Sequence, residues 1–172
     1  MKKWGMICIV LLMFSGVTQA QGWSFDGGSD YRRNVFGVDF GVGALTQTEG
    51  AQVSLGLRYL HNFCEYVGWD VIGVQGMGNT KEFDSSFMLQ GMTGIRGTTP
   101  AFYNDLSMYA NFRAGYGYCI DAEAGGFCYE LGLGINLTEN IYVGYGYDFQ
   151  SLDDSGYSLH LNYHAFRFGF NF

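Results

Sequence analysis

The chain has 172 residues, enough for one domain, and carries a formal net charge of −7. This acidic balance argues against a nucleic-acid partner. The chain contains 27 Gly, 13 Tyr and 15 Phe but one Pro. A composition rich in aromatic residues and poor in proline favours many long strands over helices.

The first 20 residues have the pattern of a secretory leader. Lys2 and Lys3 precede an apolar run over 4–14, and the small residue Ala20 follows. This predicts a signal peptide over 1–20, cleaved after Ala20. The apolar run is shorter than the roughly 20 residues of a membrane-spanning helix, and no later stretch is long enough either. Loss of both lysines leaves a mature chain with a formal charge of −9.

Segment 21–34 is polar and rich in glycine, and we expect it to be a short periplasmic lead-in. From residue 35 onward, apolar residues alternate with small or polar ones, which is the period of a β-strand. The segments expected as strands are 35–45, 50–60, 65–74, 86–96, 106–118, 127–137, 141–150 and 163–172. The third is less regular and compatible with a β-bulge near Ile72. Polar connections are expected at 75–84 and 151–159.

The closing segment, Tyr163 to Phe172, places Phe166, Phe168, Phe170 and Phe172 on one face of a strand. Here the chain resembles the outer-membrane β-barrel family, whose last strand commonly ends in an aromatic residue with further aromatics at alternate positions. The resemblance implies that Phe168, Phe170 and Phe172 form the signal read by the outer-membrane insertion machinery. It implies a location and an architecture, and no activity.

An even number of strands, each long enough to cross a bilayer when tilted, indicates an all-β fold: an eight-stranded antiparallel up-and-down transmembrane barrel over 35–172. Closure is required because backbone groups in lipid need partners. The mature chain is similar to the small OmpA/OmpX-type barrels, which implies a monomer in the bacterial outer membrane among its lipids. A soluble lipocalin-like barrel is the main alternative. Such a barrel would carry charged residues on its water-facing outside, but Lys81 is the one lysine that remains after the predicted leader.

Both termini are expected at the periplasmic side, with the loops after strands three, five and seven outside. Aromatic residues gather at both strand ends, as in the interfacial girdles of such barrels. One group is Tyr59, Trp69, Phe170 and Phe172; the other is Tyr116, Tyr118, Phe127, Tyr129, Tyr147 and Phe149.

The faces expected to point inward carry four basic and four acidic residues. They are Asp39, Arg58, Asp70, Arg96, Arg113, Glu130, Asp148 and Arg167. Two readings stay open: a salt-bridge network that fills the lumen, or a selective narrow pore. The expected register places Gly37 opposite Arg58, Gly56 opposite Asp39 and Gly134 opposite Arg113. It also places Glu130 opposite Asp148, so that Arg113 and Arg167 are expected to bridge these two carboxylates and plug the barrel.

Two further groups of residues suggest chemistry. Ser158, His160 and His164 follow the acidic residues Asp153 and Asp154, and Ser, His and a carboxylate are what acyl transfer needs. No oxyanion motif accompanies them. The main expectation is therefore a structural or surface-interaction protein with an unknown extracellular ligand. A barrel enzyme that acts on lipid acyl chains is the alternative. No cluster has metal-ligand spacing, and no metal or cofactor is expected.

The second group is a pair of cysteines, Cys119 and Cys128. If the hairpin turns midway between them, they are directly opposed and facing the lumen, at a distance that suits a disulfide in an oxidising compartment. We therefore predict a Cys119–Cys128 bond, with Cys64 free near the opposite rim.

Overall fold

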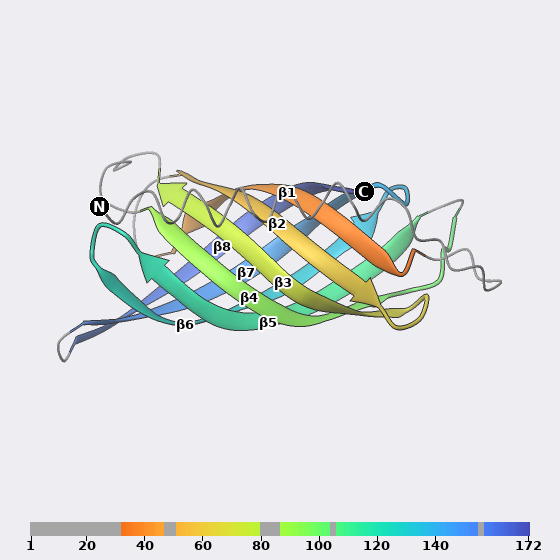
Figure 1. Ribbon diagram of the computed structural model, residues 1–172. Helices are drawn as coiled ribbons and strands as arrows, with labels where there is room; N and C mark the ends of the chain where they lie inside the picture. Colours follow the sequence, from red (N-terminus) through yellow and green to blue (C-terminus); the bar gives the residue numbers. More distant parts are fainter. Residues whose placement is uncertain (1–31, 47–50, 80–86, 104–105, 155–156) are drawn as a thin grey trace. The chain divides into compact units, whose positions relative to one another are not determined.

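The computed structural model describes residues 32–46, 51–79, 87–103, 106–154 and 157–172. They contain eight strands: β1 Asn34–Leu45, β2 Ala51–Asn62, β3 Val67–Asn79, β4 Met88–Thr98, β5 Ser107–Cys119, β6 Ala124–Asn136, β7 Ile141–Asp154 and β8 Tyr157–Asn171. Each strand pairs antiparallel with its neighbours in the chain, and β1 pairs with β8, so the sheet is a closed barrel (Figure 1). The predicted all-β eight-stranded fold is confirmed. Among these residues no helix is long and apolar enough to cross a membrane.

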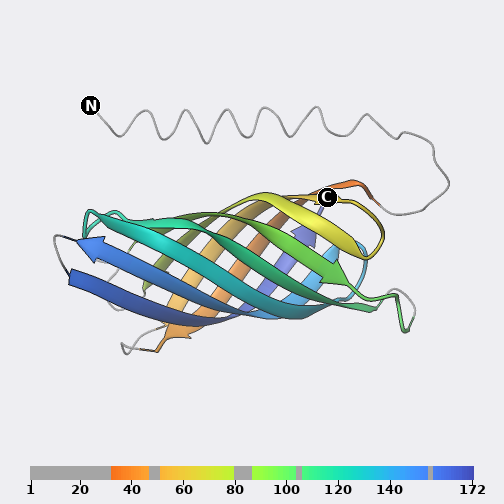
Figure 2. The ribbon, with the colours of Figure 1, turned by 90° about the horizontal axis from the view of Figure 1, so that it is seen from below.

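The predicted leader over 1–20 lies outside the described residues, as do positions 21–31 of the expected lead-in. The strand ends fall into two groups, which Figure 2 shows from a second side. We call the end that carries Asn34 and Phe172 the terminal end, and the end that carries Leu45 and Met88 the distal end.

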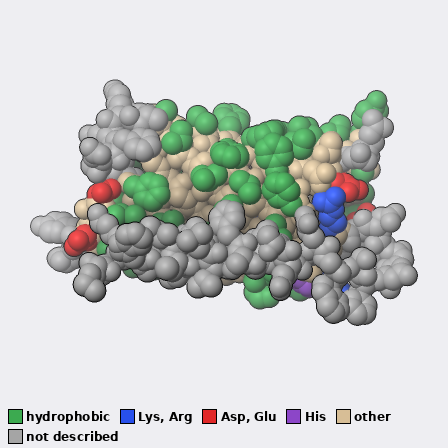
Figure 3. Space-filling model, turned by 45° about the horizontal axis from the view of Figure 1, so that its top comes forward, with side chains coloured by type: hydrophobic (Ala, Val, Ile, Leu, Met, Phe, Trp, Pro, Cys, Tyr) green, Lys and Arg blue, Asp and Glu red, His purple; other side chains and the backbone are tan. Residues whose placement is uncertain are grey.

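Alternation along the strands separates an apolar outside from a polar inside. On β1, Phe40 is 51% exposed while its neighbour Asp39 is 2% exposed. On β6, Leu133 is 64% exposed while Glu130 is 1% exposed. Hydrophobic side chains cover the middle of the barrel on the face in Figure 3, and charged ones lie toward its two ends. An exterior with so many exposed apolar side chains is typical of a lipid-facing surface, because a water-facing surface rarely carries them.

The irregular third strand contains the bulge. Across the β2–β3 ladder Tyr59 pairs with Ile72 but Leu60 pairs with Asp70, so Val71 is an extra residue. The bulge turns Ile72 outward, where it is 43% exposed, although uninterrupted alternation from Asp70 predicts an inward side chain at this position. β3 then continues to Asn79, well into the segment expected as a polar connection.

Strands at the distal end are longer than expected. β6 begins at Ala124 instead of residue 127, and the β7–β8 ladder continues until Asp154 pairs with Tyr157. The polar composition of 151–159 predicts a connection, and this prediction is wrong. Pairing with a neighbouring strand satisfies its backbone groups whatever its side chains are, so the polar residues extend the hairpin.

The last residue extends the β1–β8 ladder that closes the barrel. Phe172 exchanges two backbone hydrogen bonds with Phe36, its N–H donating over 2.7 Å and its carbonyl accepting over 3.3 Å. The rings of Phe168 and Phe170 meet edge to face, 4.9 Å apart, and Phe168 and Phe172 are exposed on the outside. Their role as an insertion signal stays a prediction.

Candidate functional site: the charged barrel interior

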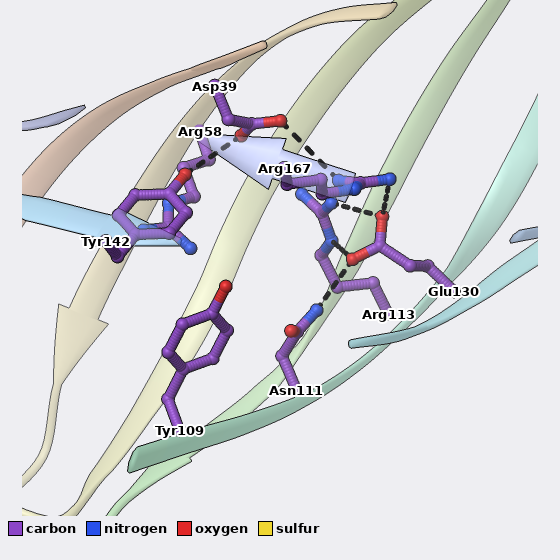
Figure 4. Close-up of a pocket in the computed structure, with 8 residues that line it drawn as sticks. All are labelled: Asp39, Arg58, Tyr109, Asn111, Arg113, Glu130, Tyr142 and Arg167. Carbon is purple, nitrogen blue, oxygen red and sulfur yellow. Dashed lines mark hydrogen bonds and ion pairs between the residues drawn. The ribbon is translucent and has the colours of Figure 1, made fainter. Parts of the chain in front are cut away.

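The centre of the lumen holds two arginines and two acidic residues linked by ion pairs. Figure 4 shows three of them, Arg113, Arg167 and Glu130. Glu130 on β6 pairs directly with Asp148 on β7, as expected. Arg113 holds Glu130 with two bonds, Nε to Oε1 at 3.1 Å and Nη2 to Oε2 at 2.5 Å. Arg167 Nη2 lies 2.5 Å from Glu130 Oε2 and 3.0 Å from Asp148 Oδ2. Arg167 thus bridges both carboxylates as predicted, whereas Arg113 binds Glu130 and not Asp148 among the contacts described.

Further polar groups extend this central layer. Asn111 donates to Glu130 Oε1 over 2.7 Å, and Arg167 Nη1 lies 3.5 Å from Asp39 Oδ1. Asp39 in turn accepts a bond from the Tyr142 hydroxyl at 3.3 Å. The carboxylates and guanidiniums are all buried, so each charge depends on these partners instead of water. The layer links strands on opposite sides of the barrel.

Glycines give the long arginines room. A Cβ at Gly73 would lie 2.8 Å from Arg113 Nη1, and one at Gly146 would lie 2.7 Å from Arg167 Nε. The expected pairs Gly37–Arg58 and Gly56–Asp39 are confirmed. The expected pair Gly134–Arg113 is wrong, because Arg113 pairs with Glu130 itself and Gly134 with Tyr109.

Arg58 and Arg96 form a separate layer nearer the terminal end. Arg58 lies 4.4 Å from the ring centre of Tyr142, and Arg96 lies 3.8 Å from that of Tyr109. Both also donate to amide side chains, Arg58 to Asn171 and Arg96 to Asn136. Within the described residues neither joins an ion pair, so the network expected to unite all eight charges is smaller. Cation–π contact holds these two guanidiniums instead.

Asp70 also stands apart from the predicted network. It is fully buried, and neither carboxylate oxygen accepts a hydrogen bond from the residues described. The bulge that follows it interrupts the β3–β4 ladder between Asp70 and Gly73. Of the eight expected charges, four bind as predicted in the centre, Asp39 joins them at its edge, and three lie outside the ion pairs.

Toward the distal end the lumen-facing residues that the structure describes are uncharged. Gln90 donates to Gln150 over 3.1 Å, and Gln150 donates to the backbone carbonyls of Gly126 and Ser151. Beyond these amides lies an apolar cluster of buried side chains. Its members are Met77, Met88, Cys119, Ala124, Leu152 and Tyr163.

Little free space remains in the centre. The cavity bounded by the charged layer and by Tyr109 and Tyr142 has a volume of about 10 Å³. A cavity needs roughly 10–15 Å³ to hold a single water. The side chains therefore fill the section, as expected for eight strands.

The cysteines do not pair as predicted. The β5–β6 turn is short, with Cys119 opposite Ala124 and Cys128 opposite Gly115. Both thiols are free and buried, and Cys64 is free and exposed. The hairpin turns earlier than midway between the cysteines, and the same displacement accounts for the wrong partner of Arg113. At the turn Glu123 takes a positive φ of 50°.

The alternative catalytic residues lie on β8, with His160 and His164 exposed on its outer side. His164 Nδ1 bonds to the Tyr145 hydroxyl, and its ring packs on Tyr147. The His160 ring stacks on Phe149 at 5.5 Å. The backbone of Ser158 pairs with that of Asp153 across the hairpin. Among the described side chains, no three drawn from His, Cys, Asp and Glu gather as a metal site.

No family model matches the sequence, and no curated protein matches it either. Several solved structures are similar in fold. Neisserial surface protein A aligns with a TM-score of 0.60 at 8% identity, over 80% of this chain and 94% of that one. The outer membrane enzyme PagL aligns with a TM-score of 0.55 at 15% identity, over 77% of this chain and 97% of that one. The N-terminal barrel domain of Pseudomonas aeruginosa OprF aligns with a TM-score of 0.51 at 12% identity, over 82% of this chain and 98% of that one.

At these identities the similarity establishes the fold. The closed antiparallel barrel, its apolar exterior and its filled polar interior agree with that fold at every level. The chain therefore has the fold of the small eight-stranded outer-membrane β-barrels, as its sequence predicted.

Proposed function

We propose that this barrel is a closed membrane scaffold that acts through its distal surface and does not conduct ions. The observation that carries the proposal is the central layer, in which Arg113, Glu130, Asp148 and Arg167 bind one another across the lumen. An ion that entered would have to break these bonds and displace fully buried charges. The amide layer and the apolar cluster add two further barriers on the distal side.

Planar-bilayer recordings on the purified, refolded protein test the closed lumen. We expect no steady unit conductance from the wild type. The double variant Glu130→Ala and Arg167→Ala should remain nearly silent, since the amides and the apolar cluster are still in place. A large and stable conductance from the wild type would contradict the proposal and favour a narrow pore.

The proposal also requires that the distal end faces the cell exterior. Cys64 lies in the β2–β3 turn at the terminal end and is exposed, so the chain has a natural probe for the periplasmic side. A membrane-impermeant maleimide should leave Cys64 unlabelled in intact cells and label it after the outer membrane is permeabilised. In a Cys64→Ser background, Glu123→Cys at the distal β5–β6 turn should label in intact cells. The reverse pattern would show the opposite orientation.

A barrel enzyme acting on lipid acyl chains is the second candidate. The observation in its favour is that His160 is exposed on the outside of β8, two residues after a serine whose backbone pairs with Asp153. The structurally similar PagL is described as an outer membrane enzyme. Acyl release from lipid A and from phospholipid should be compared between the wild type and His160→Ala. Release that disappears with His160→Ala would favour the enzyme over the scaffold.

A further inference from the structure

Sulfur-bearing side chains gather in one sector of the lumen. After residue 31 the sequence has four methionines and three cysteines. Five of these seven, Met77, Met88, Met92, Cys119 and Cys128, are buried in the interior, on the four consecutive strands β3 to β6. Most lumen positions elsewhere in the barrel carry charged or amide side chains or glycine, so this concentration is a local property of the wall.

Three of these residues pair directly across neighbouring strands. Met77 on β3 pairs with Met88 on β4, and Met88 pairs with Cys119 on β5. Directly opposed residues of one face have Cβ atoms about 4.5–5.5 Å apart. Rotation about the Cα–Cβ and Cβ–Cγ bonds of methionine moves its sulfur over a wide range, so the sulfurs can reach a shared centre. Met88 thus lies between the other two side chains, and the three form a row along the wall.

The row lies at the rim of the distal mouth. Met88 is the first residue of β4 and Cys119 is the last of β5. Their exposed fractions are 2% and 4%, and that of Met77 is 2%. The Tyr163 hydroxyl approaches Met88 Sδ at 3.8 Å from across the lumen, which orients this thioether. The site is therefore enclosed, yet only the end of a strand separates it from the aqueous side.

We propose that Met77, Met88 and Cys119 bind a single soft monovalent cation, Cu⁺, with Ag⁺ as its redox-inert analogue. Thiolate and thioether sulfur prefer Cu⁺ over hard ions such as Mg²⁺ and Ca²⁺, which take oxygen ligands. On binding, the Cys119 thiol loses its proton to water and an S–Cu bond forms. One thiolate and one Cu⁺ make a neutral unit.

Neutrality matches the surroundings. The apolar cluster around the row consists of Ala124, Leu152 and Tyr163, with no charged member. A divalent ion with the same ligands would leave a net positive charge in this enclosed apolar site, which is costly. The charge of the ion and the single thiol therefore select a monovalent cation.

Alternatively, these side chains only fill space in the lumen, since methionine commonly fills irregular gaps in cores. A binding experiment distinguishes a cation site from such packing. It uses the purified barrel in detergent, reduced and kept free of oxygen. Cu⁺ is titrated in competition with bicinchoninate. We expect one equivalent to bind the wild type, and we expect Cys119→Ser and Met88→Leu each to weaken binding at least tenfold. Heat-modifiable gel mobility establishes that each variant is folded.

The chain offers matched controls for both ligand types. Cys64→Ser removes an exposed thiol at the terminal end, and Met108→Leu removes a thioether that is 53% exposed on the outside. Neither should change the affinity. X-ray absorption of the wild type loaded with Cu⁺ gives a readout that needs no variant, and sulfur neighbours alone are expected. Loss of binding with Cys64→Ser, nitrogen or oxygen ligation, or no stoichiometric binding by the wild type would overturn the proposal.

Discussion

Glu130 and Asp148 lie directly opposite each other across the β6–β7 ladder, and both are buried. Like charges in this position repel, and the lumen gives them little water. The arrangement holds because Arg167 contacts both carboxylates and Arg113 binds Glu130 on its other side. The two arginines therefore offset the repulsion between β6 and β7 and connect these strands to β5 and β8.

Replacing Arg113 with methionine should destabilise the barrel strongly. The variant leaves three acidic residues around Arg167 and removes the two-bond contact to Glu130. Breaking a buried ion pair from one side costs about 3–5 kcal/mol. Equilibrium urea unfolding in lipid vesicles measures this loss. Arg32→Met removes an arginine from an exposed pair with Glu139 and should unfold like the wild type; equal losses in both variants would contradict the explanation.

The two facing carboxylates should differ in importance. Glu130 accepts bonds from Arg113, Arg167 and Asn111, whereas Asp148 accepts from Arg167. Asp148→Asn also removes the repulsion while keeping the shape of the side chain. We therefore expect Glu130→Gln to lower the free energy of unfolding more than Asp148→Asn does. The same urea titration ranks the two variants, and the opposite order would show that the bridge depends mainly on Asp148.

Two glycines of β4 provide a matched pair for packing. A Cβ at Gly94 would collide with the backbone carbonyl of Phe112, which cannot move without distorting β5. A Cβ at Gly91 would meet nothing within 4 Å. We expect Gly94→Ala to reduce the folded fraction and Gly91→Ala to fold normally, as measured by heat-modifiable mobility. Equal behaviour would mean that β4 and β5 can separate at no cost.

Deleting Phe172 should impair barrel assembly. The deletion removes both backbone hydrogen bonds to Phe36 at the terminal end of the β1–β8 seam, together with an exposed aromatic ring. Phe172→Tyr keeps the seam and an aromatic ring and should assemble like the wild type. The amount of heat-modifiable protein in outer-membrane fractions measures the effect. Normal amounts of the deletion variant would show that the last residue is dispensable.

Thiol counting tests the revised state of the cysteines. In the folded barrel, maleimide should modify Cys64 and spare Cys119 and Cys128, which are buried. After unfolding without a reductant, all three should react. A single reactive thiol in the unfolded, unreduced protein would restore the Cys119–Cys128 disulfide that the β5–β6 register argues against.

The sequence was most informative where side chains face two different solvents. Residues such as Phe40 and Asp39 differ so strongly in polarity that the period of two assigns their faces without further information. Glu130 and Asp148 were paired correctly because a short turn at 138–140 sets the register of β6 and β7. In contrast, no pattern in the sequence marks the β5–β6 turn, since Gly125 and Gly126 extend the strand instead of forming the loop.

The positions of Arg58 and Arg96 were missed for a different reason. A count of charges pairs every arginine with an acid, but Tyr109 and Tyr142 also point inward and accept the guanidiniums on their ring faces. These tyrosines were visible in the alternation as inward residues. Which arginine meets a ring and which meets a carboxylate depends on the stagger of the strands around the barrel, which composition does not specify.

The extra residue Val71 has an effect well beyond its own position. Before it, even-numbered residues of β3 such as Asp70 face the lumen; after it, odd-numbered residues such as Gln75 and Met77 do. If the ladder ran through Val71 with regular pairing and no bulge, Gln75 and Met77 would face lipid and Val74 would enter the lumen. One bulged residue thus decides the solvent of every later side chain on the strand. A homologue without the bulge, aligned without a gap at this point, would have the inner residues of this strand matched to outer ones.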